Sequence, residues 1–197
     1  MKTRYARILL LLAAAVTGWL AGCGNDDDTL PDEVTAIERW FSRQQIIPQA
    51  EAEQIGETRY YSVQEGVYKY VANRSRPGRP ADQTGAAQGD SVEFYFEAYT
   101  FTTAPAALPY FTNKRSVVEE KMPGLNPEYW SFEPIRAKIG SSSIIKGVDL
   151  ALPYCQPGDS VVMLITSDLG YGEELTGVVE KNTTLMWIVN IENVKKQ

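Results

Sequence analysis

The residues best placed to do chemistry lie in a loop where a tyrosine stands between two glycines, SDLGYGEELTG at residues 167–177. The loop follows the apolar run SVVMLITS, whose composition is typical of a strand. Because glycine accepts backbone conformations that other residues avoid, Gly170 and Gly172 allow this loop to approach another molecule closely. The Tyr171 hydroxyl could donate a hydrogen bond to a bound carbonyl oxygen, or it could simply cap a turn of its own chain.

The composition excludes several kinds of active site. The chain contains no histidine, so neither a Ser-His nor a Cys-His nucleophile pair can form. No credible set of zinc ligands is present, and we expect neither a metal nor a cofactor. Gly172 and Gly177 have the spacing of two P-loop glycines, but Val178 stands where that motif requires a lysine. Histidine-dependent nucleophilic catalysis and zinc catalysis are therefore not expected at the loop.

Hydrophobic periodicity predicts the elements that position the loop. Alternation with period two predicts strands at residues 66–73, 91–99, 135–139, 160–167 and 183–194. Residues 144–152 indicate one short helix, and the proline-punctuated stretch 102–133 is irregular except for a helical piece near 116–121. The sum is an α+β fold, in which a mainly antiparallel sheet curls around one short helix.

An amphipathic helix is predicted before this sheet, at residues 32–46. Its apolar positions recur at helical spacing, Asp32 suits the N-cap, and Pro48 suits the stop. We expect the apolar stripe to dock on the following domain, with a dimerisation arm as the alternative. The stripe consists of Val34, Ile37, Trp40 and Phe41.

The N-terminus has the features of an export signal. Residues 1–22 combine three early cations with an apolar run and close on small residues before Cys23. The sequence Leu-Ala-Gly-Cys resembles the lipobox of bacterial lipoproteins, which implies that Cys23 carries lipid. A transmembrane helix is the alternative, but the apolar run is short for one. With Cys23 lipidated, Cys155 has no disulfide partner, and we expect it to be a small buried residue.

The acidic balance of the chain bears on its partners and location. Removal of residues 1–22 takes away three cations and no acid, which leaves 16 cations against 25 acids, a formal net charge of −9. A nucleic acid is therefore not an expected partner. Residues 23–31 read as an acidic tether, and the aspartates after Cys23 resemble the surface-export signal of Bacteroidetes lipoproteins. We expect an extracytoplasmic protein anchored by lipid to a bacterial membrane, most simply the outer one, with its face and oligomeric state left open.

The C-terminal half contains the run IGSSSIIKGVDLALPYCQPGDSVVMLITSDLGYG, followed by TLMWIVNI. The order of these elements resembles that of an FKBP-type peptidyl-prolyl isomerase. The similarity is good over residues 139–194 and looser from GVYKYVAN onward, so residues 65–197 would form the FKBP-like domain and 32–64 a helical segment before it.

The resemblance implies a set of site residues. Tyr171 matches the family's loop tyrosine, and the backbone amide of Ile145 matches the group that holds the ligand. The departures are Val148 in place of a tryptophan, Phe96 in place of a tyrosine and Thr112 in place of an aspartate. A further pocket phenylalanine falls at Ile135. The implied binding residues are Phe96, Phe111, Ile144, Ile145, Val148, Val178, Val179 and Trp187.

The family's activity fits a chain without histidine. An isomerase needs only to bind a twisted X-Pro amide better than a planar one, so proline-containing polypeptides are the implied partners. Because Val148 removes a large ring from the implied pocket, a non-catalytic binding or chaperone module is the alternative. Phe96 and Trp187 could equally serve only to fill the core. A surface subunit of a nutrient-uptake system is a third interpretation, which rests on the acidic tether alone.

Overall fold

The computed structural model describes residues 29–81, 84–124, 126, 128 and 130–197. The expected signal peptide and Cys23 lie outside the described residues, as does the tether up to residue 28. Within the described part, no helix has the length and hydrophobicity needed to cross a membrane. The elements are α1 (Thr29–Arg43), β1 (Ile47–Pro48), α2 (Gln49–Ile55), β2 (Tyr60–Gln64), β3 (Val67–Val71), β4 (Ser91–Phe101), β5 (Phe111–Thr112), α3 (Arg115–Lys121), β6 (Ile135–Lys138), α4 (Lys146–Ala151), β7 (Ser160–Ile165), the 3-10 helix η4 (Ser167–Leu169) and β8 (Thr184–Lys195).

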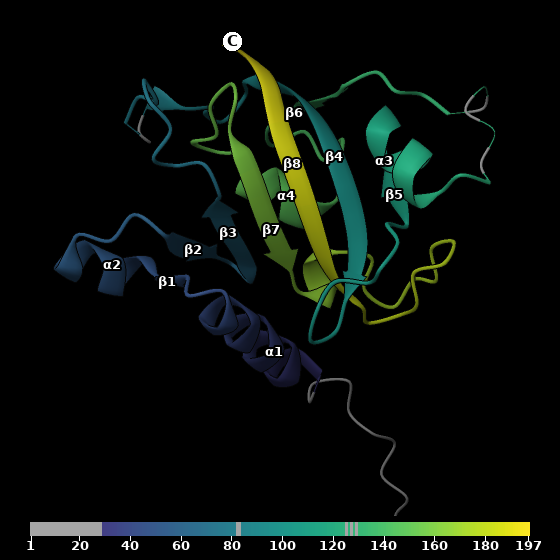
Figure 1. Ribbon diagram of the computed structural model, residues 1–197, viewed down its shortest axis with the longest axis horizontal. Helices are drawn as coiled ribbons and strands as arrows, with labels where there is room; N and C mark the ends of the chain where they lie inside the picture. Colours follow the sequence, from purple (N-terminus) through teal and green to yellow (C-terminus); the bar gives the residue numbers. More distant parts are fainter. Residues whose placement is uncertain (1–28, 82–83, 125, 127, 129) are drawn as a thin grey trace, which may run out of the picture.

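The strands form one sheet in the order β1-β2-β3-β7-β8-β4-β5, with β6 paired to β4 (Figure 1). Every pairing is antiparallel except that of β1 with β2. The predicted strands overlap β3, β4, β6, β7 and β8, so the antiparallel sheet is confirmed. In β4 the predicted inward face is also confirmed, because Val92, Phe94, Phe96 and Ala98 are all fully buried.

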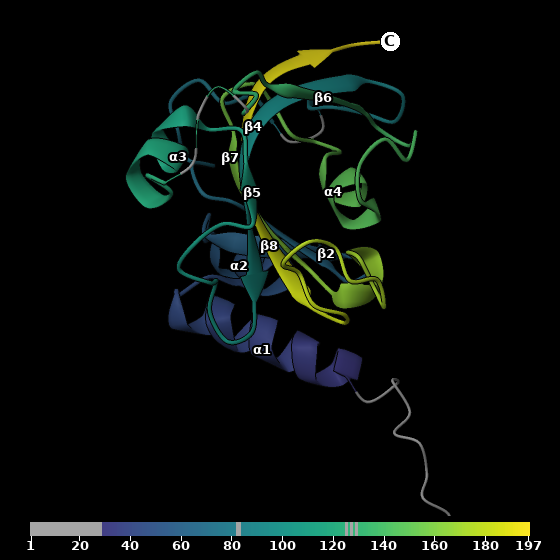
Figure 2. The same cartoon turned by 90° about the vertical axis from the view of Figure 1, so that its right-hand side faces the viewer.

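Helix α4 covers one face of the sheet (Figure 2). It brings Val148, Ala151 and Leu152 into a core that also includes Phe96 and Trp187. The helix approaches closely because residue 147 is glycine: a Cβ there would lie 2.2 Å from Cγ2 of Ile165. Cys155 is buried in the same core, as the sequence predicted.

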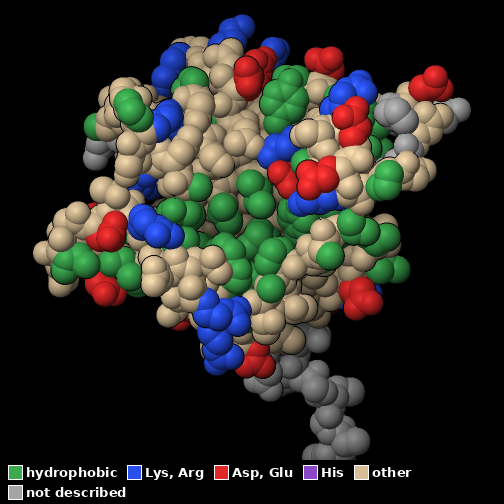
Figure 3. Space-filling model, viewed as in Figure 1, with side chains coloured by type: hydrophobic (Ala, Val, Ile, Leu, Met, Phe, Trp, Pro, Cys, Tyr) green, Lys and Arg blue, Asp and Glu red, His purple; other side chains and the backbone are tan. Residues whose placement is uncertain are grey.

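Helix α1 packs on the opposite face of the sheet and forms a second core. Ile37 and Phe41 are fully buried there, and the Phe41 ring stacks on Tyr61 with centroids 4.5 Å apart. The expected docking of the apolar stripe is therefore confirmed. On this side of the molecule, hydrophobic side chains also gather in a hollow over the middle of the sheet (Figure 3). The buried residues of this second core are Ile37, Phe41, Ile46, Tyr61, Tyr68, Tyr70, Tyr99, Phe101, Leu164 and Met186.

The N-terminal segment differs from its prediction in three ways. Helix α1 begins at Thr29, so Asp32 lies within its first turn and is not the N-cap. Pro31 is accepted there because the first turn of a helix needs no backbone donor. Pro48 does not simply end a helix: it precedes α2, which the sequence analysis did not predict. Residues 32–64 also contribute strands β1 and β2 to the sheet, and helices cover both of its faces.

Candidate active site

The loop that carries Tyr171 joins β7 to β8. It opens with η4, and the Gly172 N–H donates back to the Ser167 carbonyl at 2.8 Å. Gly170 packs tightly, since a Cβ at this position would lie 2.9 Å from Cδ1 of Leu185. Gly172 has φ +57°, a conformation that favours glycine. This backbone directs the Tyr171 ring against the α4 side of the core, where it lies half-buried.

Four of the expected binding residues are buried in the same hydrophobic core, and we call these four the floor: Phe96, Val148, Val179 and Trp187. The Trp187 and Phe96 rings stack nearly parallel, with centroids 4.6 Å apart and an interplanar angle of 10°. Trp187 is 4% exposed, and the other three are at most 1% exposed. The surface on which a proline ring would rest in a pocket of this kind is therefore covered by the protein's own side chains.

Tyr110 covers part of the floor, and the sequence analysis did not identify it. The Trp187 Nε1 donates a hydrogen bond to the Tyr110 hydroxyl at 2.9 Å. The Tyr110 ring also meets the Tyr171 ring edge to face, with centroids 6.1 Å apart. Burial, with a contribution from the nearby Tyr171, raises the pKa of Tyr110. The only feature of the sequence that could have pointed to Tyr110 is its position directly before Phe111, which the sequence analysis included among the binding residues.

Phe111 remains accessible beside the floor. Its side chain is 47% exposed, and its ring meets Phe96 edge to face at 5.2 Å. Trp130 flanks it at 5.9 Å and donates its indole N–H to the Thr112 carbonyl. Thr112, which stands where the family has an aspartate, donates its own hydroxyl to the Phe96 carbonyl at 2.6 Å. Thr112 is therefore engaged inside the sheet.

The Ile144-Ile145 pair lies at the start of α4, where both side chains pack partly buried against the core. Ile145 is the N-cap residue. Among the residues that the structure describes, its N–H donates no hydrogen bond. This amide is thus free to bind a carbonyl oxygen of another molecule, as an amide at a helix N-terminus commonly does.

The start of α4 and the Tyr171 loop meet at the same end of the sheet. Gly147 contacts Ile165, which pairs with Leu185 across β7 and β8. Leu185 in turn contacts Gly170, the residue before Tyr171. We call the accessible residues around the floor the rim: Tyr110, Phe111, Ile144, Ile145 and Tyr171.

The remaining expected site residues are divided between the two groups or lie apart. Val178 is 77% exposed, whereas its neighbour Val179 is buried in the floor, so the structure separates this pair. Ile135 packs partly buried against the core, as expected for a substitute of a pocket aromatic. Two cavities, of about 430 and 420 Å³, are lined by other parts of the chain. Within the described residues, no group of acidic or cysteine side chains is arranged to hold a metal ion.

Comparison with known proteins assigns the family. A family model described as FKBP-type peptidyl-prolyl cis-trans isomerase matches residues 83–192. The chain is 33% identical over 66 residues to FK506-binding protein 1A of Aspergillus fumigatus, which covers 33% of this chain and 59% of that relative. It is 25% identical over 126 residues to FK506-binding protein 1 of Aspergillus oryzae, covering 64% and 96%.

A solved structure agrees on the fold. The chain superposes on the crystal structure of the three FKBP domains of wheat FKBP73 with a TM-score of 0.51 and 14% identity, covering 70% of this chain and 49% of that one. At this identity the likeness concerns the fold alone. Since the family model spans more than half of the residues, the chain belongs to the FKBP-type peptidyl-prolyl cis-trans isomerase family.

Proposed function

We propose that this protein is a peptidyl-prolyl cis-trans isomerase that acts on polypeptides outside the cytoplasm, and that the rim is its substrate-binding surface. The observation that carries the proposal is the free Ile145 N–H at the same end of the sheet as Tyr171. Two donors on either side of an aromatic surface suit a peptide whose carbonyl groups must be held while a proline ring packs nearby.

The chemistry required of such a site is modest. Rotation about a peptide bond is opposed by a barrier of about 18–20 kcal/mol, which comes from amide resonance. A site lowers this barrier when it binds the twisted amide more tightly than the planar one. Ile145 N–H would hold a carbonyl of the peptide, and the Tyr171 hydroxyl would hold a second one. The half-exposed Phe111 ring would supply apolar contact.

The covered floor supports a second candidate, a binding module without catalysis. A proline ring on the rim cannot reach Trp187, Phe96 or Val148 unless Tyr110 moves, because these side chains are almost inaccessible. A polypeptide could still bind to the accessible aromatic and aliphatic groups, but the water-poor surroundings that favour the twisted amide would be reduced. Such a module would hold unfolded chains or a partner protein.

The proposed location rests on the N-terminal sequence. Lipid on Cys23 would anchor the protein to a bacterial membrane after removal of residues 1–22, and more than one acyl chain is needed for firm attachment. We expect Cys23→Ala to move the protein from the membrane fraction to the soluble fraction. Retention of this variant in membranes at the wild-type level would contradict lipid anchoring through Cys23.

The function is tested by the cis/trans exchange rate of a peptide with an apolar residue before proline. The protein should accelerate exchange, and Tyr171→Phe should lower the catalysed rate by a factor of about 2–10, since a typical hydrogen bond contributes roughly 0.5–1.5 kcal/mol. Tyr154→Phe is the matched control: it removes the same hydroxyl from a tyrosine that is 54% exposed and lies outside the rim and floor.

Exchange at the uncatalysed rate with protein in excess over peptide would decide against the isomerase. Catalysis that Tyr154→Phe and Tyr171→Phe reduce equally would instead decide against the proposed role of the Tyr171 hydroxyl. If the peptide binds in a fluorescence or calorimetric titration while exchange stays uncatalysed, the binding module is the correct function.

A further inference from the structure

A carboxylate on α1 contacts the base of the Tyr171 loop. Glu33 lies in the first turns of that helix, before the region that the family model matches. Its carboxylate accepts three hydrogen bonds from residues far along the chain. The Ser167 N–H donates at 2.7 Å, the Ser167 hydroxyl at 2.5 Å and the Thr184 hydroxyl at 2.7 Å.

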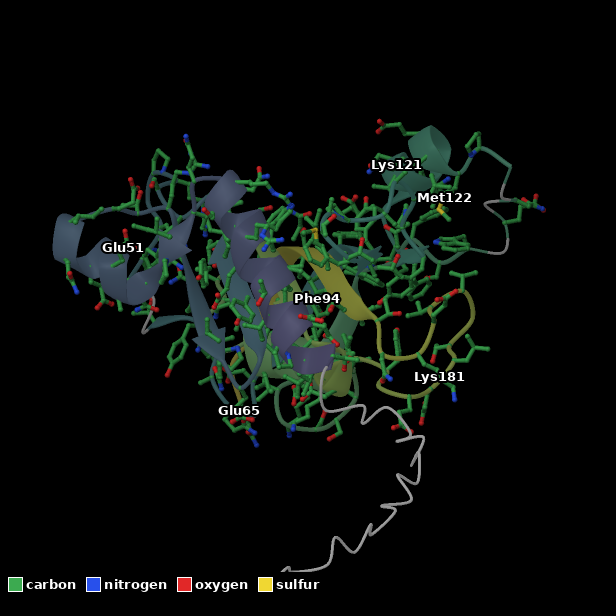
Figure 4. All side chains as sticks on the ribbon, turned by 90° about the horizontal axis from the view of Figure 1, so that it is seen from below. Glu51, Glu65, Phe94, Lys121, Met122 and Lys181 are labelled. Carbon is green, nitrogen blue, oxygen red and sulfur yellow. The ribbon has the colours of Figure 1, made fainter. Side chains whose placement is uncertain are left out.

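These partners are the two ends of the loop. Ser167 is the first residue of η4, and Thr184 is the first residue of β8. In Figures 1 and 4 the first turn of α1 lies at the same end of the molecule as this loop, on which Figure 4 labels Lys181. One side chain of α1 therefore joins the point where the loop leaves the sheet to the point where it returns.

The contact continues from Ser167 to the glycines beside Tyr171. The Ser167 carbonyl accepts hydrogen bonds from the N–H groups of Gly170 at 3.0 Å and Gly172 at 2.8 Å. Glu33 holds Ser167 through both its N–H and its hydroxyl, so it restrains the position of the residue whose carbonyl accepts these two hydrogen bonds. A shift of Ser167 would thus displace the turn that presents the Tyr171 ring.

The surroundings make these hydrogen bonds strong. Ser167 is 3% exposed and Thr184 is 5% exposed, so their polar groups have little access to water. Hydrogen bonds to a charged acceptor are stronger than neutral ones, and a buried donor that loses its partner is destabilised. Attachment of α1 to the sheet does not require Glu33, because the buried Ile37 and Phe41 already provide it.

We propose that Glu33 is a positioning residue for the Tyr171 loop, so that the N-terminal helix controls the geometry of the rim. The consequence for substrate rests on the proposed function, whereas the consequence for loop order does not. Helix α1 lies before the region that the family model matches, yet through Glu33 it would help to shape the site. This role of Glu33 differs from that of the apolar stripe, which attaches the same helix to the sheet.

The test compares Glu33→Ala with wild type by amide hydrogen exchange and by peptide binding. We expect exchange at Ser167, Gly170 and Gly172 to accelerate by about tenfold or more, while amides in the centres of β7 and β8 keep their rates. Peptide affinity should fall at least as much in Glu33→Ala as in Tyr171→Phe. The same holds for the isomerisation rate if the protein catalyses isomerisation. Glu33→Gln keeps one acceptor oxygen and should restore much of the loop protection.

Asp32→Ala is the matched control, since it removes a neighbouring carboxylate from the same exposed helical turn. It should leave exchange in the loop unchanged. The proposal is overturned if Glu33→Ala leaves loop exchange at the wild-type rate, if Asp32→Ala has the same effect, or if exchange rises evenly over all amides. If wild type neither binds nor isomerises the peptide, the proposed function fails, and the exchange data still decide whether Glu33 orders the loop.

Discussion

The floor and the rim of the candidate site consist of similar apolar and aromatic side chains, but they differ in their access to solvent. The floor packs as part of the core, with Trp187 stacked on Phe96 and hydrogen-bonded to Tyr110. The rim leaves Phe111 half-exposed and the Ile145 N–H free. Residues that a family resemblance assigns to one pocket thus divide into a group that stabilises the fold and a group that is available to a ligand.

This division separates stability from binding. A fully buried side chain contributes through the apolar area it removes from water and through close packing. A half-exposed side chain on the rim, such as Phe111, contributes less to folding but can contact a second molecule. Substitutions in the floor should therefore change the free energy of unfolding, and substitutions in the rim should change affinity.

The largest expected effect comes from placing in the floor the tryptophan that the resemblance to the family implies at residue 148. Val148 is fully buried, so Val148→Trp would overfill the core, and we expect a loss of about 1–3 kcal/mol or more in the free energy of unfolding. Chemical denaturation measures this loss. Val178→Trp is the matched control, because the same substitution at a 77% exposed position should change stability by less than about 0.5 kcal/mol.

A stable Val148→Trp variant with faster isomerisation would show that the floor has room for a ring. The comparison between floor and rim would then fail, since the covered floor would be an adaptable pocket. Loss of stability without gain of activity is the outcome that agrees with the structure.

An intermediate effect is expected on the rim. Phe111→Ala removes a ring that contacts Phe96 and Trp130 but is half-exposed. We expect peptide affinity to fall by about fivefold to tenfold, which corresponds to roughly 1–1.4 kcal/mol, with a smaller loss of stability than a floor substitution gives. A titration of the peptide together with a denaturation curve separates the two quantities, and unchanged affinity would remove Phe111 from the binding surface.

The smallest expected effect on the rim is that of low pH. Acid should lower the free energy of unfolding of the protein but should not change the binding of peptide to the rim. Burial alone would raise the pKa of Asp159, but hydrogen bonds from Arg79, Arg76 and the Gln156 N–H outweigh it and lower the pKa below 3.8. A carboxyl whose pKa is lower in the folded state stabilises the fold above its unfolded value. This contribution is lost as the pH falls below about 3.8.

Denaturation curves between pH 3 and pH 7 measure this acid dependence. Asp159→Asn should be less stable at neutral pH and should flatten the decline below pH 4, while affinity of the folded protein for the peptide changes little. An affinity that falls in parallel with stability would indicate that the carboxylate network and the rim are coupled.

Much of the scaffold was predictable from local sequence. Alternation in residues 91–99 identified β4 and its inward face, and the helical spacing of Ile37 and Phe41 identified the docking stripe of α1. Both features depend on the period of one element. The start of α1 was misplaced because Asp32 was taken as the N-cap. Helix α2 was not found because Pro48 was read as a stop signal, although proline is also accepted at the beginning of a helix.

The site was less predictable than the scaffold. The sequence located the Tyr171 loop and the Ile144-Ile145 pair by resemblance, and the structure places them at one end of the sheet. It did not identify Tyr110, and it grouped Val178 with Val179 although Val178 lies in the turn between Thr176 and Val179 and is exposed, whereas Val179 is buried. A resemblance between two sequences shows which residue types correspond, but it does not show which side chain fills a given part of the folded core.

The sequence by itself determined the antiparallel sheet, the two helices that pack on it and the absence of histidine chemistry, since strand and helix periods and residue types are local properties. Only the tertiary structure decided that Tyr110 and Trp187 close the floor and that Glu33 contacts Ser167 across 134 residues. Such contacts depend on how distant elements pack against one another, and no periodicity within a single element encodes them.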